Sequence, residues 1–366
     1  MPGIITHSRV FYESINFLKK EKHSNIYSKS IEILFKSKNF KKAGLFGALG
    51  PNIFAYLPFK KNNYISGSEI SYELHSNQNE KLLKSMLFTL ISYKDQNNEW
   101  ASNQRAYLYG LISHLISDSF FNPYIYYWSG FTTSGNKAEQ KYFREQHLLL
   151  ENNLDVFFSQ PFDGDYNKNP YDFNLDDMLP EWEKYGLQQV EHPIKTFLLN
   201  SIKEAHPETY NKLIIIKQKD NEILPAIFIM NLIPIFIKFS FKIKNSRNPQ
   251  LIKIINYIKK KKLFYSDYLI KYPPSGKLNT HVLNLHKERW FHPTGSSGLH
   301  YESVKDLLFI SCERIADIWK KIEEILFSKS GDTSKIENEL KINAITGVFE
   351  KDFNSMNLQN PIHLHF

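Results

Sequence analysis

Two histidine–carboxylate pairs at helical spacing are the residues of this chain best suited to chemistry. His114 and Asp118 lie four residues apart in LYGLISHLISDSFFNPYIYY, where Asn122 continues the spacing, and His147 and Glu151 repeat it in YFREQHLLLENNLDVFF. Residues four apart lie one above the other on a helix, so each pair points in one direction from an otherwise apolar helix. Imidazole and carboxylate groups suit zinc. The two helices therefore predict the walls of a buried metal site, with room for more than one ion if they face each other.

The elements that must position these pairs are predicted to be helices. Apolar residues recur at the helical period over most of the chain, which predicts an all-α bundle with long connections. The predicted helices cover residues 6–20, 27–37, 78–94, 102–120, 138–159, 195–216 and 301–328. Ser303 and Asp306 stand at the head of the last helix, as capping residues do. Segments 129–137 and 160–175 are rich in turn formers and are predicted loops.

Composition sets the class of protein. At 366 residues and 42% hydrophobic, the chain can bury a large core as one domain or two. The single Cys312 excludes a disulfide framework and a cysteine-based zinc site, and its apolar surroundings indicate a packed thiol. The first 20 residues lack the charge and apolar pattern of a secretory signal, so we expect a cytoplasmic protein.

Charge and hydropathy suggest a membrane surface more than a nucleic acid as a partner. The net charge of +8 is modest for this length, and no nucleic-acid-binding motif occurs. Residues 223–237 form the most apolar run, which is shorter than the roughly 20 residues of a membrane span and contains Pro225 and Pro234. Basic residues follow up to 262. A peripheral membrane contact through 223–262 fits this pattern, and so does a core helix followed by a solvated charge run.

Three further motifs could complete a metal site. His7 lies in GIITH at the start of an amphipathic helix, Asn52 lies in the Gly-Pro turn GALGPN, and His75 lies in YELHS just before a helix. Each alone is weak, because single histidines near helix starts are usually caps or surface groups. Their joint occurrence with the two histidine–carboxylate pairs, in this order, is far more specific.

As a set, these motifs resemble the zinc-dependent phospholipase C family, which shares a superfamily with zinc-dependent nucleases. In that family a terminal amine and a Thr-His come first, followed by a Gly-x-x-Gly-Pro-Asp turn and a histidine before a helix. A Gly-x-x-x-His-x-x-x-Asp-x-x-x-His helix and a His-x-x-x-Glu or -Asp helix come next. The resemblance covers about residues 1–160. It implies an all-α fold with a metal-binding core at 1–160, and residues 161–366 are then an additional helical region packed on the core or continuous with it.

The resemblance also implies which residues hold zinc. His75, His114 and Asp118 would hold the first ion. Asp118 would bridge to a second ion, completed by His7 and by the amine of Pro2 once the initial methionine is removed. Further ligands carried over for a third ion are His147, Glu151 and Asn122. The expected cofactor is thus two or three Zn²⁺ ions.

Two positions depart from the family pattern. Asn52 stands where the family has an aspartate that contacts the cluster or acts as general base, and an amide cannot accept a proton at neutral pH. Asn122 replaces a histidine ligand, and its carbonyl oxygen is a weaker zinc ligand than imidazole. The third ion is therefore expected to be weakly held or replaced, while the ligands of the first two remain complete.

The expected activity is phosphodiester hydrolysis on a phospholipid or related ester, with Asp118 as bridging ligand and Asn52 in the position of the base. Zinc can supply an activated water without a protein base. Nearby aromatic residues could receive a choline-like head group or only pack the helices. Two alternatives stay open at this point: a zinc-dependent nuclease, and a catalytically impaired metal-binding scaffold, which the two asparagines favour.

Overall fold

A computed structural model gives the fold and confirms the all-α class. It describes residues 3–20, 25–56, 67–76, 79–160, 175–179, 192–214, 226–246, 253, 270–274, 277–296, 298–328 and 332–357. The helices of the first part are α1 (Ile4–Lys20), α2 (Ile26–Leu34), α3 (Lys38–Gly47), α4 (Asn52–Ala55), α5 (Gly67–His75), α6 (Asn79–Ile91), α7 (Glu99–Ser129) and α8 (Lys137–Phe158). Later helices are α9 (His192–Ala205), α10 (Pro207–Ile214), α11 (Ala226–Asn245) and α13 (Val304–Phe327), with short 3-10 turns at Leu175–Asp177, His281–Leu283 and Phe353–Ser355. In the described ranges the only sheet is a small antiparallel hairpin of β1 (Trp290–Phe291) and β2 (Leu299–His300).

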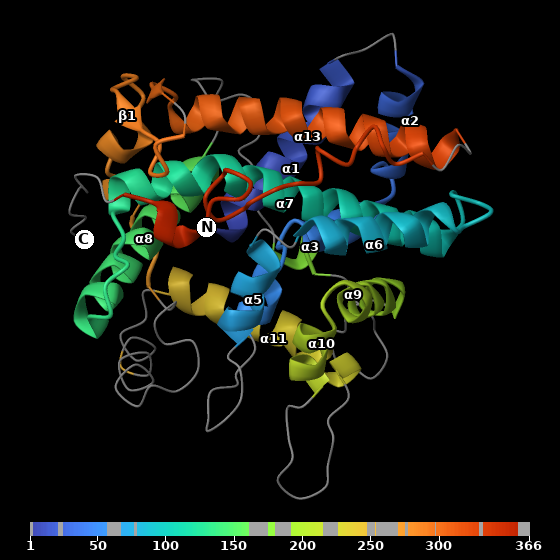
Figure 1. Cartoon of the computed structure of the whole chain (residues 1–366), viewed down its shortest axis with the longest axis horizontal. Coiled ribbons are helices and arrows are strands. Elements are labelled where there is room, and N and C mark those ends of the chain that lie inside the picture. Colours follow the sequence, from blue (N-terminus) through green and yellow to red (C-terminus); the bar gives the residue numbers. More distant parts are fainter. Residues whose placement is uncertain are drawn as a thin grey trace, which may run out of the picture.

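Helix α7 is the axis of the bundle. It is 31 residues long and buried along most of its length, and its first turn is capped by Asn98, whose side chain accepts from the Ala101 N–H. Helices α1, α3, α8 and α13 all contact it, and α13 runs alongside it (Figure 1). Because α7 is covered on several sides, a polar side chain on it is held in a fixed position away from water.

Helices α3 and α7 pack at unusually short range through glycines. A Cβ built at Gly110 would lie 1.9 Å from the carbonyl oxygen of Gly44, and one at Gly47 would lie 2.2 Å from that of Tyr107. Neither position accepts a side chain without separating the helices. This contact brings the turn that follows α3 directly against the middle of α7, where His114 lies.

One predicted helix end was wrong, because α7 continues through Pro123 to Ser129 instead of ending near 120. A proline inside a helix removes one hydrogen bond, here the one to the Ser119 carbonyl. That carbonyl lies against Gly347, where a Cβ would come within 2.3 Å of it. The residues beyond the proline are largely buried, as Tyr124 and Ile125 show, so packing outweighs the lost hydrogen bond.

Other local predictions are settled by the structure. Ser303 and Asp306 form a reciprocal capping box at the head of α13, Cys312 is buried, and 129–137 connects α7 to α8. The helix predicted over 195–216 is two helices, because Pro207 begins a new one. Helices α3, α4 and α5 were missed.

The buried side chains form one continuous core that joins helices from both halves of the chain. The predicted division into a metal-binding core at 1–160 and an additional region at 161–366 stays a prediction. In and just after the apolar run, α11 buries Met230, Ile233 and Ile237 and exposes Ile235 and Phe239. Among the described helices, none combines the length and hydrophobicity needed to cross a bilayer. The basic residues predicted to follow, from 247 to 262 except Lys253, lie outside the described residues.

Candidate metal centre

Three histidines converge on one buried carboxylate. His7 of α1 places its Nε2 3.3 Å from Asp118 Oδ1, while His114 and His75 place theirs 3.2 Å and 3.4 Å from Oδ2. All four side chains are almost fully buried. The ligand atoms of His7, His114 and Asp118 lie within 4.8 Å of one another, which is the size of a site for a metal ion. The structure thus brings together four predicted ligands from α1, α5 and α7.

Backbone carbonyls fix the ring orientation of two of these histidines. The Nδ1 of His114 lies 2.9 Å from the Ala48 carbonyl oxygen, and the Nδ1 of His75 contacts the Ser71 carbonyl oxygen. A carbonyl can only accept, so each Nδ1 carries the proton. In the neutral ring the Nε2 is then unprotonated and presents a lone pair toward Asp118.

The third histidine is oriented by a hydroxyl group. Ser117 donates its hydroxyl to the His114 carbonyl oxygen at 2.9 Å, so its oxygen is left to accept from His7 Nδ1 at 2.8 Å. The His7 ring also stacks on the His114 ring, with centroids 3.9 Å apart. As in the other two histidines, the proton of the neutral ring lies on Nδ1, and the Nε2 of His7 is the atom that faces the carboxylate.

In the described part of the chain, several polar atoms at the centre of this cluster have no hydrogen-bond partner. Both oxygens of Asp118 and the Nε2 of His7 are buried without a hydrogen bond among the described residues. The Nε2 atoms of His75 and His114 are only 2.8 Å apart, although each ring has already donated its proton elsewhere. Nitrogen lone pairs that face one another and a carboxylate repel each other. A cation bound between them removes this repulsion. The donor set therefore fits zinc.

Electrostatics keep the cluster in the protonation state that a metal needs. Burial lowers the pKa of His75 and of His114, so both rings are neutral at neutral pH. Burial alone would raise the pKa of Asp118, but His114 and His7 outweigh it and hold that pKa well below its usual value. A carboxylate facing neutral imidazoles is the ionisation state in which these groups bind zinc.

The Gly-Pro turn after α3 holds the ring of His114 in place. Gly50 has a φ of 58°, in the left-handed region that favours glycine. A Cβ at Gly50 would lie 2.2 Å from the His114 ring. This residue must therefore be glycine both for its backbone conformation and for its contact with the histidine.

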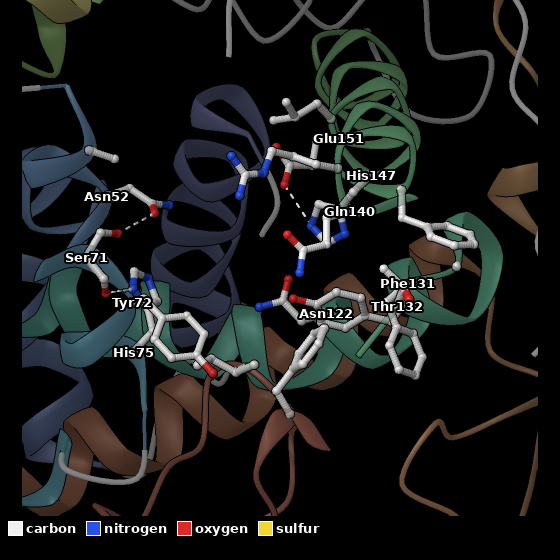
Figure 2. Close-up of a pocket in the computed structure, with 18 residues that line it drawn as sticks. Asn52, Ser71, Tyr72, His75, Asn122, Phe131, Thr132, Gln140, His147 and Glu151 are labelled. Atoms are coloured by element: carbon white, nitrogen blue, oxygen red, sulfur yellow. Dashed lines mark hydrogen bonds and ion pairs between the residues drawn. The ribbon is translucent and has the colours of Figure 1, made fainter. Parts of the chain in front are cut away.

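The second predicted pair lines a cavity beside the cluster. His147 Nε2 lies 3.0 Å from Glu151 Oε1 on α8. Figure 2 shows this pair across the cavity from Asn52 and Ser71, with Asn122 between the two sides. The cavity has a volume of about 440 Å³, and its wall includes His75 from the first cluster. Its aromatic lining consists of Tyr72, Tyr126, Phe131, Phe143 and Phe353.

The two asparagines that depart from the family pattern both face this cavity. Asn52 accepts a hydrogen bond from the Ser71 hydroxyl at 3.3 Å. Asn122 is fully buried and donates to the Ala344 carbonyl, and its Oδ1 is without a hydrogen bond among the described residues. That oxygen is the atom with which an amide binds a metal. Pro2, the remaining predicted ligand, lies outside the described residues.

Sequence reasoning missed the residues that hold the ligands in place. Ser71, Ser117 and the Ala48 carbonyl have no distinctive sequence signal, because backbone and hydroxyl acceptors occur everywhere. Asp155 did have a signal, since it extends the spacing of His147 and Glu151 by one more turn of α8. Most aromatic residues of α7 near the site, such as Phe121 and Tyr124, belong to the core instead of the cavity.

Comparison with known proteins gives one family. The model of the family described as zinc dependent phospholipase C matches residues 7–213, which extends past the predicted limit near 160. Neither the curated proteins nor the solved structures give a match. The matched region contains His7, His75, His114, Asp118 and the pair on α8. This chain belongs to the zinc-dependent phospholipase C family.

Proposed function

We propose that this protein is a zinc-dependent phosphodiester hydrolase that acts on a phospholipid. The observation that carries the proposal is the group of three fixed imidazoles around the buried carboxylate of Asp118, which accepts no hydrogen bond from the residues that the structure describes. Zinc bound to such a donor set supplies Lewis-acid stabilisation of phosphate oxygens and a nucleophilic water at neutral pH. The family match and the adjacent cavity support phosphate-ester chemistry at this place.

The side chains of the protein would hold the zinc ions at up to three positions. His75, His114 and Asp118 would hold one zinc ion, and Asp118 with His7 would share a second. A third position would use His147 and Glu151, with the Oδ1 of Asn122 as the weaker donor. Two ions are expected to be firmly held and the third weakly held.

The cavity next to the cluster supports an ester with a polar head and apolar chains. Its aromatic side chains provide apolar walls that exclude water, and Asn52, Thr132 and Gln140 provide hydrogen-bonding groups. Asn52 can orient a phosphate or a water through its amide, but it cannot remove a proton. Proton removal from the attacking water would then depend on the metal alone, which predicts a slow enzyme.

A metal-binding scaffold without turnover is the second candidate, and the asparagines at 52 and 122 are the observations that favour it. The two candidates differ in turnover and share zinc binding.

Purified protein should be assayed for zinc and for hydrolysis of phosphatidylcholine and of a chromogenic phosphodiester. Asp118→Asn should lose zinc and reduce activity by more than about 100-fold. Asp317→Asn, at a half-exposed position of α13 away from the site, is the matched control.

Zinc-loaded protein that turns over none of these esters would favour the scaffold. Protein that holds no zinc after purification in zinc-containing buffer would contradict both candidates. Hydrolysis of single-stranded nucleic acid in preference to lipid would instead support a nuclease.

We further propose that α11 touches the lipid surface. Ile235 and Phe239 are 42% and 46% exposed, one turn apart, and Lys238 and Lys242 lie beside them. An exposed apolar pair flanked by lysines fits an anionic bilayer. Ile235→Ser with Phe239→Ser should reduce sedimentation with phosphatidylserine-containing vesicles. Phe309→Ser, an exposed phenylalanine on α13, should not.

A further inference from the structure

The first turn of α1 lacks a cap of its own. The His7 N–H donates to the Gly3 carbonyl oxygen at 3.1 Å, which makes Gly3 the residue at the N-cap position. The side chain at that position normally accepts from the backbone N–H groups of the first turn. Glycine has no side chain and the first turn is buried at Thr6, so another part of the protein must supply the acceptor.

Asp155 of α8 supplies that acceptor. Its Oδ1 accepts from the Thr6 N–H at 2.9 Å and from the Thr6 hydroxyl at 2.8 Å. Its Oδ2 accepts from the Tyr272 hydroxyl at 2.9 Å. A Cβ at Gly3 would lie 2.1 Å from that oxygen, so glycine leaves the space that the carboxylate occupies. The negative charge also lies at the positive end of the α1 dipole.

The rest of this network comes from the second half of the chain. Lys244, near the end of α11, is half-buried and donates to the Asn152 side chain at 3.3 Å. Its ammonium group lies 5.4 Å from the ring of Tyr272. Asp155 is therefore buried with a positive charge nearby, as a buried carboxylate requires.

We propose that Asp155 is a positioning residue of the metal centre, which holds His7 in place by capping α1 from the neighbouring helix. His7 directly follows Thr6, so fraying of this turn displaces the His7 imidazole. The other three ligands lie on α5 and α7 and do not depend on this turn. Loss of Asp155 should therefore weaken the zinc ion that uses His7 and spare the one held by His75 and His114. This inference rests on the proposed zinc centre.

A second buried carboxylate in the protein provides a matched control. Glu323 accepts from the Tyr109 hydroxyl and from the Ser30 hydroxyl, both at 2.8 Å. It thus resembles Asp155 in burial and in its two hydroxyl donors, but its partners on α2 and α7 are not ligands. Glu323→Gln should lower the melting temperature and leave zinc binding unchanged.

The test measures zinc affinity by chelator competition, together with the visible spectrum of the cobalt-substituted protein. Asp155→Asn should bind one zinc ion about 10- to 100-fold more weakly and alter the cobalt spectrum. Thr6→Val, which keeps the backbone N–H but removes the hydroxyl, should have a smaller effect, and Thr6→Ser should restore wild-type affinity. Should Asp155→Asn fail to fold, the Thr6 pair still decides the question.

The outcomes separate this inference from the proposed function. Wild-type affinity for every zinc ion in Asp155→Asn or Thr6→Val would overturn the positioning role while the zinc centre stands. Equal zinc loss in Glu323→Gln and Asp155→Asn would also overturn it, because the effect would then be one of general stability. A wild-type protein without zinc would overturn the centre itself.

Discussion

His75 and His114 face each other with their Nε2 atoms 2.8 Å apart, although the Nδ1 proton of each ring is donated to a backbone carbonyl. Two neutral rings in this state cannot hydrogen-bond through these atoms. The carboxylate of Asp118 lies beside them and accepts no hydrogen bond from the described residues. These groups therefore form a site that is more stable with a bound cation than without one.

Zinc should therefore stabilise the folded protein. A ligand that binds only the native state at 100 times its dissociation constant adds about 2.7 kcal/mol to the free energy of unfolding. Thermal unfolding should shift upward by several degrees with zinc and downward after EDTA treatment. His114→Gln should lose most of this shift. A melting temperature that is the same with zinc and with EDTA would contradict the prediction.

The α8 pair should contribute to a separate ion. His147→Ala removes a ligand from the third position and leaves Asp118 and its three histidines intact. Zinc analysis should show either one ion fewer or no change, depending on whether the third ion survives purification, but never loss of the Asp118 ions. Glu145→Ala, on the exposed side of α8, is the control. Loss of all zinc from His147→Ala would show that the two clusters are not separate.

Asn52→Asp should increase activity. The carboxylate would restore a proton acceptor beside the cavity, and general-base catalysis contributes about 10²- to 10⁴-fold when the base is well placed. The rate should rise at least about 10-fold and show a new acidic limb in its pH profile. Asn136→Asp, at the head of α8, is a matched asparagine-to-aspartate change away from the site. Unchanged or lower activity in Asn52→Asp would argue against a base position here.

Acid should destabilise the metal-free protein through its buried histidines. Burial lowers the pKa of His75 and of His114 in the folded state, so between those values and the ordinary value of about 6.5 the unfolded chain binds more protons. Stability should therefore fall as the pH drops below about 6.5. Melting temperatures measured in EDTA from about pH 8 to 5 should decline more steeply in wild type than in His75→Gln with His114→Gln. Equal slopes for the two proteins would contradict this account.

Gly50→Ala should damage both stability and metal binding. The left-handed backbone costs an alanine about 1–2 kcal/mol, and the new methyl group would collide with the His114 ring. Zinc affinity and melting temperature should both fall. Gly135→Ala, in the open loop before α8, should leave both unchanged. Normal zinc affinity in Gly50→Ala would show that the turn does not hold the ring.

The residues that converge on Asp118 were easier to predict from the sequence than the elements that position them. His114 and Asp118 could be predicted because helical spacing alone places them on one face of a buried helix. His7 and His75 could be predicted only through the order of the family's motifs, since they lie on other helices than Asp118 and far from it in the sequence. Their meeting at Asp118 depends on helix contacts that local patterns do not encode.

The missed features have physical reasons. Helix α5 was not predicted because GSEISYELH is short and polar, and its position comes from tertiary contact with α4. The continuation of α7 past Pro123 depends on burial that outweighs a lost hydrogen bond. Asp155 continues the four-residue spacing of His147 and Glu151. Its role as the cap of α1 could not be predicted, because the sequence does not show that Gly3 lies against it.

The most direct test of the zinc centre is a crystal structure of the zinc-loaded protein with anomalous diffraction measured at the zinc edge. We predict zinc peaks bonded to Asp118 together with the Nε2 atoms of His75, His114 and His7. Crystals of zinc-treated protein with no anomalous peak at Asp118 would contradict the central claim.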